Sequence, residues 1–208
     1  MLNLTKLIEN NRNWVEEMTA IDPEFFAKRE GNQQPHFLMI GCSDSRVPLE
    51  LMTGALPGEM FVHRNIGNQV WSTDMNVLSV LDFAVRMLEV HHIIVCGHSN
   101  CGALTAATGE RSAGVLDYWL ADIRNTNRWH RTELDACPDG ESRLRRLSQL
   151  NVLQQVGHLS RLPTILDSWK RGRSPLLHGW VYDIGSGLVE RIVEGVGSVD
   201  EASRLPTS

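Results

Sequence analysis

Two cysteines and one histidine in this chain have the types and the spacing of a metal site. His98 and Cys101 are separated by two residues, so that one tight loop can present both side chains, while Cys42 lies far upstream. Thiolate sulfur and neutral imidazole are ligands that Zn²⁺ prefers, and three protein ligands are the number found in catalytic sites that keep one position open. The sequence therefore predicts a zinc site that Cys42 closes across the fold.

A carboxylate and a guanidinium follow the first of these ligands. Asp44 and Arg46 lie two and four residues after Cys42. Arginine can hold a carboxylate by two parallel hydrogen bonds, a geometry that lysine cannot reproduce. Such a pair keeps Asp44 ionised beside the metal, where it can accept a hydrogen bond from zinc-bound hydroxide. An isolated pair of this kind is usually an ordinary surface ion pair, but its place between a metal ligand and the rest of the motif favours a functional role.

The order Cys-x-Asp-x-Arg followed by His-x-x-Cys resembles the β-class carbonic anhydrases. Four further stretches resemble the family as well, namely residues 57–66, 73–76, 92–98 and 177–183. The resemblance runs from roughly residue 2 to residue 195, which is nearly the whole chain. A His-x-x-Cys alone is a weak signal, whereas the two motifs in this order and context are specific.

The resemblance implies Zn²⁺ as the cofactor and the reversible hydration of CO₂ to bicarbonate and a proton as the reaction. Zinc lowers the pKa of bound water toward about 7, so that hydroxide is available near neutral pH. Two thiolates make the metal a poorer Lewis acid, and a group that orients the hydroxide then matters more. The resemblance gives this role to Asp44 held by Arg46, and it implies a closed state in which Asp44 binds zinc as a fourth ligand.

Further residues are expected to contact the substrate. The resemblance places a glutamine that meets bicarbonate or CO₂ at Gln33, with Gln34 as the alternative. Gly102 directly follows a metal ligand and is a candidate backbone donor at the start of a helix. Val47 and Val70 are candidates for an apolar wall that suits CO₂, although apolar residues are equally expected there as core.

One branch of the family has a second, regulatory bicarbonate pocket made by a tryptophan, an arginine and a tyrosine. Arg64 and Tyr182 match two of these positions, but the tryptophan position is Met39. Methionine has no indole N–H to donate to an anion. The regulatory pocket is therefore in doubt, and weak inhibition by bicarbonate is expected.

The pattern of apolar residues predicts an α/β fold in a single domain spanning residues 1–208. Short apolar runs predict strands at 36–40, 60–63, 91–96, 176–183 and 188–193, and helical periodicity predicts helices at 2–19, 74–90, 101–107, 115–131 and 141–160. This alternation favours a mostly parallel central sheet flanked by helices. Residues 1–30 are expected to form an N-terminal helical arm, and 196–208 a flexible polar tail. Cys42 and His98 each follow a strand, at the sheet edge where open α/β sheets bind ligands.

Composition limits the partners. The formal net charge of −5 argues against nucleic acid, and no apolar run is long enough for a membrane span. The N-terminus does not read as a secretory signal, and four cysteines are too few for a disulfide scaffold, which together indicate a cytoplasmic protein. Cys96 lies in an apolar run and is expected to be an inert core residue. The resemblance implies a homodimer or homotetramer in which the N-terminal helix embraces a partner.

Three alternative functions remain at this stage. A hydrolase of CS₂ or COS on the same fold would activate linear substrates in the same way. A non-catalytic zinc protein is disfavoured because a structural site usually has a fourth tight cysteine or histidine. A redox role for the His98-x-x-Cys101 segment is least favoured, since it has no second cysteine at that spacing.

Overall fold

The computed structural model describes residues 2–111 and 114–205 and divides into two compact units. The first unit is Met1–Gln34 and the second is Pro35–Ser208. The boundary lies four residues beyond the predicted end of the N-terminal arm. All three predicted zinc ligands, together with Asp44 and Arg46, belong to the second unit.

The first unit contains one long helix, α1 (Leu4–Ile21), and a short 3₁₀ turn, Ala27–Arg29. The side chain of Asn3 begins α1 by accepting a hydrogen bond from the backbone N–H of Lys6 at 2.8 Å. None of the helix residues is buried. Instead, Trp14 meets Phe25 and Phe26 edge-on, with ring centroids 6.3 and 5.3 Å away, so this unit has a small aromatic cluster of its own.

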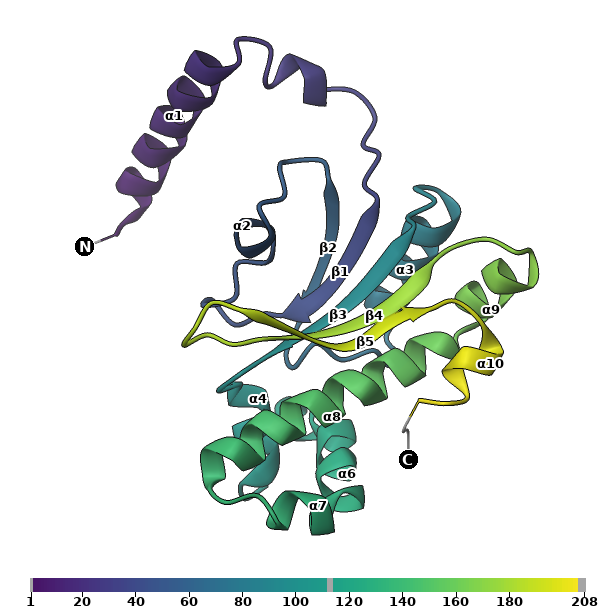
Figure 1. Cartoon of the computed structure of the whole chain (residues 1–208). Coiled ribbons are helices and arrows are strands. Elements are labelled where there is room, and N and C mark those ends of the chain that lie inside the picture. The colour runs from purple at the N-terminus through teal and green to yellow at the C-terminus, as the bar shows by residue number, and fades with distance from the viewer. Residues whose placement is uncertain (1, 112–113, 206–208) are drawn as a thin grey trace. The chain divides into compact units, whose positions relative to one another are not determined.

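The second unit is built around a twisted sheet whose described strands confirm the predicted α/β class (Figure 1). The strands are β1 (Phe37–Cys42), β2 (Met60–Asn65), β3 (His92–His98), β4 (Leu176–Tyr182) and β5 (Val189–Val196). Their order is β2-β1-β3-β4-β5, and all neighbouring pairs are parallel except β4 with β5. The parallel strands end at one edge, which brings the residues after β1 and β3 together.

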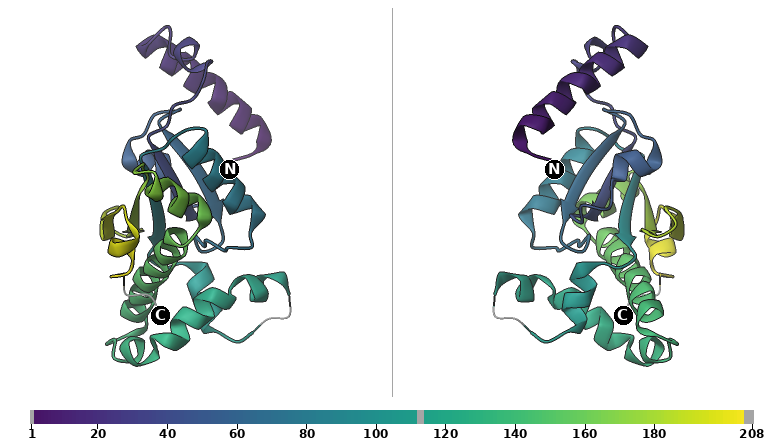
Figure 2. Two further views of the ribbon diagram at one scale, coloured as in Figure 1. Left: turned by 90° about the vertical axis from the view of Figure 1, so that its right-hand side faces the viewer. Right: turned by 90° about the vertical axis from the view of Figure 1, so that its left-hand side faces the viewer.

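Helices connect the strands and cover mainly one face of the sheet. They are α2 (Leu49–Thr53), α3 (Met75–Arg86), α4 (Gly102–Thr108), α5 (Val115–Trp119), α6 (Ala121–Trp129), α7 (Arg131–Asp135), α8 (Gly140–Ser160), α9 (Pro163–Lys170) and α10 (Val199–Ala202). The larger core cluster joins inward residues of the strands, such as Ile40 and Val95, to α3 and α8. The side views in Figure 2 allow both helices to be followed next to the strands. A smaller cluster around Met39 and Ile94 lies on the opposite face, where α2 contributes Leu49.

Glycines bring α8 unusually close to the strands. A Cβ on Gly179 would lie 2.6 Å from a methyl group of Val152, and one on Gly97 would lie 2.8 Å from the same side chain. Any larger residue at either position would therefore push α8 away from the sheet. Because Gly97 directly precedes His98, this close packing places α8 against the end of β3.

Several elements differ from the sequence expectation. The helix expected over 115–131 is two short helices, α5 and α6, with α7 beginning at its last residue, because Leu120 and His130 leave helical backbone geometry. The helix expected over 74–90 is α3, which ends at Arg86 and has an exposed apolar side that includes Met75 and, just after the helix, Met87. The periodicity did not indicate α2 or α9.

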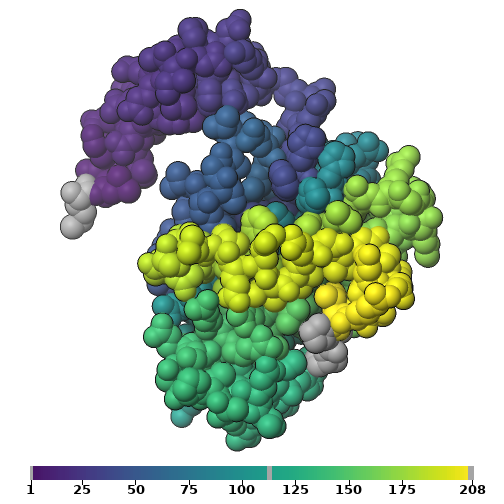
Figure 3. All heavy atoms as spheres, viewed as in Figure 1, coloured from purple at the N-terminus to yellow at the C-terminus, as the bar shows by residue number. Residues whose placement is uncertain are grey.

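The chain after β5 contains α10, within the segment expected to be a flexible tail. The side chain of Ser198 accepts a hydrogen bond from the N–H of Glu201, and the Glu201 carboxylate accepts one from the N–H of Gly197. The first bond satisfies an N–H group that the first turn of a helix leaves without a partner, and the second ties the Glu201 side chain to the residue before the cap. Residues from β5 to α10 form the yellow band on the face shown in Figure 3. Residues 206–208 lie outside the described part of the chain.

None of the helices in the described ranges, 2–111 and 114–205, has the length and apolar character needed to cross a bilayer.

Candidate metal centre

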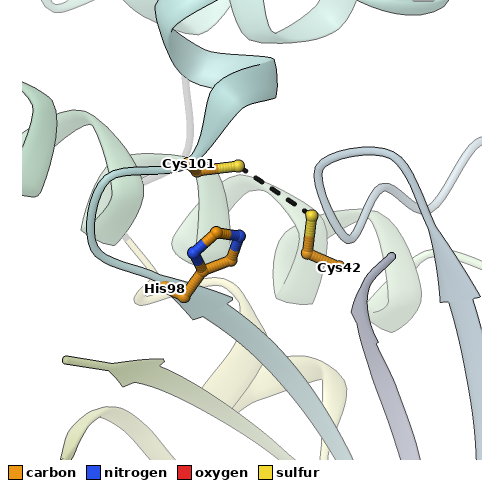
Figure 4. A group of neighbouring side chains, drawn as sticks. All are labelled: Cys42, His98 and Cys101. Carbon is orange, nitrogen blue, oxygen red and sulfur yellow. Dashed lines mark hydrogen bonds between the residues drawn. The ribbon is translucent and has the colours of Figure 1, made fainter. Parts of the chain in front are cut away.

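The structure brings the three predicted metal ligands together at the carboxyl edge of the sheet. Cys42 is the last residue of β1, His98 is the last residue of the neighbouring β3, and Cys101 directly precedes α4. Their ligand atoms all lie within 4.8 Å of one another, and all three residues are buried. Figure 4 shows the two sulfur atoms and the imidazole ring converging on one space.

A tight loop between β3 and α4 aims these side chains. Asn100 has a φ of +53°, in the left-handed region that asparagine tolerates better than most residues. Ser99 fixes the loop on both sides, since its N–H donates to the carbonyl of Tyr182 and its hydroxyl accepts from the N–H of Ile184, each at 2.9 Å. Sequence reasoning passed over Ser99, although its place between two ligands was a usable signal.

The hydrogen bonding of His98 leaves one ring nitrogen for a metal. Nδ1 lies 2.9 Å from the carbonyl oxygen of Ser99, an acceptor only, so Nδ1 carries the proton in the neutral ring. Nε2 then has a lone pair and finds no hydrogen-bond partner among the described residues, although the side chain is fully buried. Buried polar atoms are normally paired, so this nitrogen points to a missing ligand.

The two sulfurs have the separation that a shared zinc ion requires. Cys42 Sγ and Cys101 Sγ are 3.9 Å apart. Two Zn–S bonds of about 2.3 Å at a tetrahedral angle place the sulfurs about 3.8 Å apart. The donor set, its spacing and the unpartnered Nε2 therefore fit zinc.

Local hydrogen bonds favour the thiolate form of Cys42. The Cys101 thiol donates to Cys42, and the backbone N–H of Gly67 also lowers the pKa of Cys42 against the opposing effect of burial. The Gly67 nitrogen lies 3.4 Å from the sulfur. The same Cys42–Cys101 bond and burial raise the pKa of Cys101, because its proton is the one shared. A divalent cation between the two sulfurs would replace that proton.

Arg46 clamps Asp44 as the sequence predicts. Nε and Nη2 of Arg46 donate to the two carboxylate oxygens at 2.9 and 2.7 Å, and the Arg46 backbone N–H adds a third bond at 2.9 Å. These bonds hold the pKa of Asp44 far below its usual range. Asp44 Oδ2 lies 3.8 Å from His98 Nε2, so the carboxylate borders the space that the three ligands enclose while it remains paired with Arg46.

Arg46 also joins the two loops that carry the ligands. Its Nη2 donates at 3.1 Å to the carbonyl of Asn100, in the loop between His98 and Cys101. The guanidinium therefore spans from the segment after Cys42 to the segment before Cys101. This second contact was not evident from the sequence, because it depends on the packing of β1 beside β3.

The residues expected to contact the substrate lie in different parts of the structure. Val47 and Val70 are both fully buried, Val47 in the smaller core cluster and Val70 in the larger. Gly102 is the first residue of α4, and a Cβ there would meet open space. Gln33 and Gln34 are exposed and belong to the first unit, so their roles remain predictions.

The residues of the possible regulatory pocket make other contacts. The guanidinium of Arg64 donates from Nη2 to the carbonyl of Val47. Tyr182 is half-buried and packs against the cluster that contains Met39, which is fully buried. Whether these residues bind bicarbonate stays a prediction.

Cys96 has the environment expected of an inert thiol. It is fully buried, and burial raises the pKa of Cys96 to about 12. The reactive thiolate is therefore disfavoured at this position, in contrast to Cys42 at the end of the neighbouring strand β1.

The comparison with known families agrees with this centre. A family model described as carbonic anhydrase matches residues 37–189, which include all three ligands. The chain belongs to the β-carbonic anhydrase family. The predicted resemblance is thereby confirmed.

Individual relatives show the same similarity over most of the chain. A carbonic anhydrase of Emericella nidulans is 43% identical over 185 residues, which cover 89% of this chain and 81% of the relative. One of Pseudomonas aeruginosa is 37% identical over 81% of this chain and 78% of the relative.

Solved structures share the fold as well. The β-carbonic anhydrase of Coccomyxa matches with a TM-score of 0.93 and 36% identity, covering 99% of this chain and 93% of its own. A tetrameric β-carbonic anhydrase of Sordaria macrospora matches with a TM-score of 0.85 and 41% identity, over 89% of this chain and 94% of its own.

Proposed function

We propose that this protein catalyses the reversible hydration of CO₂ to bicarbonate and a proton with zinc as its cofactor. The observation that carries the proposal is the buried Cys42–His98–Cys101 cluster with its unpartnered Nε2, bordered by a carboxylate that Arg46 holds in place. Membership of the β-carbonic anhydrase family supports the same reaction.

Each side chain has a distinct part in this proposal. Cys42, His98 and Cys101 hold the zinc ion, which supplies a water of lowered pKa when it is bound. Asp44 stays ionised because of Arg46 and accepts a hydrogen bond from the attacking water or hydroxide. A carboxylate that can only accept fixes the orientation of that oxygen, so that its lone pair faces the carbon of CO₂.

Arg46 keeps Asp44 available for that task. Without Arg46, the Asp44 carboxylate would be free to move toward the metal position, since its Oδ2 is already 3.8 Å from the ligand nitrogen of His98. The bidentate bond and the bond to Asn100 hold Arg46 and Asp44 in one arrangement. A closed state, in which Asp44 binds zinc, would require the bidentate bond to break.

Other residues complete the substrate side of the proposal. Val47 and Val70 would form the apolar wall for CO₂, the N–H of Gly102 would donate to bicarbonate, and Gln33 would offer its amide. The support is the buried apolar character of the two valines and the open space at Gly102.

The assembly proposed is a homo-oligomer, either dimer or tetramer. The support is the similarity to the tetrameric enzyme of Sordaria macrospora. A cytoplasmic location is supported by the four cysteines, all of which are free, since thiols persist in reducing compartments.

The decisive experiment is a stopped-flow assay of CO₂ hydration on zinc-loaded protein, with metal-stripped protein as the control. We expect rapid hydration that requires zinc. Parallel assays with CS₂ and COS test the hydrolase alternative, which would be favoured if those substrates turned over while CO₂ did not. Stoichiometric zinc without any turnover would identify a non-catalytic zinc protein and refute the proposal.

A further inference from the structure

A row of polar side chains runs along the buried face of α8 toward the metal centre. Ser148, Asn151, Gln155 and His158 lie at spacings of three, four and three residues, which place them on one side of a helix. Ser148, Asn151 and Gln155 are at most 2% exposed, in a helix whose other buried residues are mainly Leu and Val. Burying such amides is costly unless they are hydrogen-bonded, so their partners show what the row does.

Asn151, Gln155 and His158 each have a backbone partner in the segment that follows β2. Asn151 Nδ2 donates to the carbonyl of Gly67 at 3.0 Å, and Gln155 Oε1 accepts from the N–H of Val70 at 2.7 Å. His158 Nδ1 lies 3.0 Å from the carbonyl of Val70 and completes the grip on that residue. The row therefore fixes the backbone of the segment at both Gly67 and Val70.

The two amides also fix each other's orientation. Gln155 Nε2 donates to Asn151 Oδ1 at 3.1 Å and to the carboxylate of Asp122 at 2.8 Å. With Asn151 Oδ1 accepting, its Nδ2 must face Gly67, and with Gln155 Nε2 occupied, its Oε1 must face Val70. Exchanging oxygen and nitrogen in either amide would break several bonds, so the network has one arrangement.

The held segment touches a metal ligand. The N–H of Gly67 donates to Cys42 Sγ at 3.4 Å, and Gly67 adopts a φ of +77° to present it. The carbonyl of the same residue is the group that Asn151 holds. Asn151 thus acts on the Cys42 sulfur through Gly67, whose carbonyl it binds and whose N–H donates to the sulfur.

The same row reaches a second ligand. The hydroxyl of Ser148 donates to the carbonyl of His98 at 3.1 Å. The close approach of α8 that Gly97 permits makes this contact possible, because a Cβ there would lie 3.1 Å from Ser148 Oγ. The helix α8 therefore positions both the backbone of His98 and the Gly67 N–H group that donates to Cys42.

We propose that Asn151, with Gln155 and Ser148, is a positioning residue of the zinc centre: the row on α8 holds the Gly67 N–H against the Cys42 sulfur and thereby fixes the position of that ligand. A hydrogen bond to a charged sulfur is stronger than one between neutral groups. Groups behind the ligands of a metal typically change its affinity or activity 10–100-fold. The inference depends on the proposed function only through zinc itself, not through the reaction.

The test compares three variants of the full-length protein by metal readouts. Asn151→Ala removes the donor to Gly67, Ser148→Ala removes the donor to His98, and Ser160→Ala is the matched control. Ser160 is also a buried serine of α8, but its hydroxyl donates to the carbonyl of Gly157 within the same helix. Zinc affinity is measured by competition with a chelator, and the sulfur-to-metal charge-transfer band is recorded on cobalt-loaded protein.

Asn151→Ala is expected to lower zinc affinity at least tenfold. Its charge-transfer band should move to lower energy, because a thiolate without its N–H donor gives up an electron more easily. Ser148→Ala should lower affinity less and leave the band in place, since it acts on the histidine side, and Ser160→Ala should change neither. Wild-type affinity and an unmoved band in Asn151→Ala, or equal changes in Ser160→Ala, would overturn the inference.

A second measurement needs no variant, in case Asn151→Ala fails to fold. In wild-type protein loaded with the NMR-active isotope of cadmium, the Gly67 amide proton should show scalar coupling to the metal through the N–H···S bond. A Gly67 amide without such coupling overturns the inference. Wild-type protein that binds no zinc at all would instead refute the proposed function, so the two failures are distinguishable.

Discussion

Histidines lie at both edges of the parallel sheet, but they differ in whether their ring nitrogens have hydrogen-bond partners. At the carboxyl edge, His98 is fully buried and its Nε2 has no partner among the described residues. At the amino edge, four histidines lie in two pairs. His36 meets His91 through their Nδ1 atoms at 3.0 Å, and His92 Nδ1 meets His178 Nε2 at 3.0 Å.

The second pair shows how histidine nitrogens at the amino edge are satisfied by protein groups. β4 and β5 lose register around His178, and Gly195 opposite has a φ of +71°. At this irregularity the Gly195 N–H donates to His178 Nδ1 at 3.2 Å. His178 must then carry its proton on Nε2 and donate to His92, so the nitrogens that face one another are all satisfied.

The contrast gives a criterion that separates a metal ligand from a structural histidine: whether each ring nitrogen has a hydrogen-bond partner. The rings of His98, His92 and His178 all belong to strands, and all three are partly or fully buried. Only at the carboxyl edge does a buried lone pair face two sulfurs with no donor between them. An unpaired nitrogen in that setting calls for a cation, whereas a paired one is explained by the fold.

The largest effect is expected from breaking the carboxyl edge itself. Replacing Cys42, His98 or Cys101 by alanine should remove stoichiometric zinc and the hydration activity together, because two ligands cannot hold the ion in the same way. Zinc content by metal analysis and rate by stopped flow are measured on the same samples. Cys137→Ser, which removes a thiol that is not one of the three ligands, is the control and should keep both. A full complement of tightly held zinc in Cys101→Ala would refute the ligand assignment.

A smaller effect is expected when the carboxylate beside the ligands is changed but the ligands remain. Asp44→Asn should keep zinc and lose about 10–100-fold in kcat, because an amide donates as well as accepts and no longer orients the attacking oxygen. The ratio of bound zinc to protein and kcat are the two readouts. Loss of zinc in this variant would show that Asp44 serves the metal rather than the reaction.

The clamp on Asp44 can be tested separately. Arg46→Ala should resemble Asp44→Asn, because the released carboxylate can close onto zinc. Arg46→Lys should be impaired too, since lysine can make neither the bidentate bond to Asp44 nor, at the same time, the bond to Asn100. Wild-type kcat/KM between about pH 7 and 9 in Arg46→Ala would contradict the clamp.

Regulation by bicarbonate should be weak in the unmodified protein. Without an indole N–H at Met39, the closed state loses about one hydrogen bond to a charged group, on the order of 1.5–3 kcal/mol. Met39→Trp should strengthen inhibition by about tenfold or more in bicarbonate concentration. Rate is followed against bicarbonate at fixed pH and ionic strength, with thermal unfolding as the control because Met39 is tightly packed. Strong sigmoidal inhibition of the wild type would show that Arg64 and Tyr182 suffice.

The smallest effect is expected at the amino edge. Burial lowers the pKa of His178 and of His92, with further lowering from neighbouring histidines and an opposing effect of Glu194 on His178. The unfolded chain then binds protons more readily than the folded one, so this pair contributes stability above about pH 6.5 that is lost as pH falls below it. His178→Asn keeps an acceptor for Gly195 but cannot titrate. Its denaturation midpoint should depend less on pH between about 5 and 7 than that of the wild type, and an unchanged slope would contradict the pairing.

Much of the centre could be predicted from the sequence because its signals are local. The spacing of His98 and Cys101, and of Asp44 and Arg46 after Cys42, fixes which side chains one loop can present. Runs of apolar residues before Cys42 and His98 predicted β1 and β3, and strand ends in a parallel sheet meet at one edge. The helices α2 and α9 escaped prediction, since short helices carry too few turns for a periodic signal.

What the sequence determined by itself is the chemistry: two thiols, one imidazole, and a carboxylate with an arginine made to hold it. The tertiary structure decided which hydrogen bonds hold these groups in position. The second bond of Arg46 to Asn100, the bond of Ser148 to the His98 carbonyl, and the bond of Asn151 to Gly67 each join residues that are brought together by packing. Residue types and local spacing determine what a site can bind, but hydrogen bonds between distant segments depend on how closely helices and strands pack, which no local pattern records.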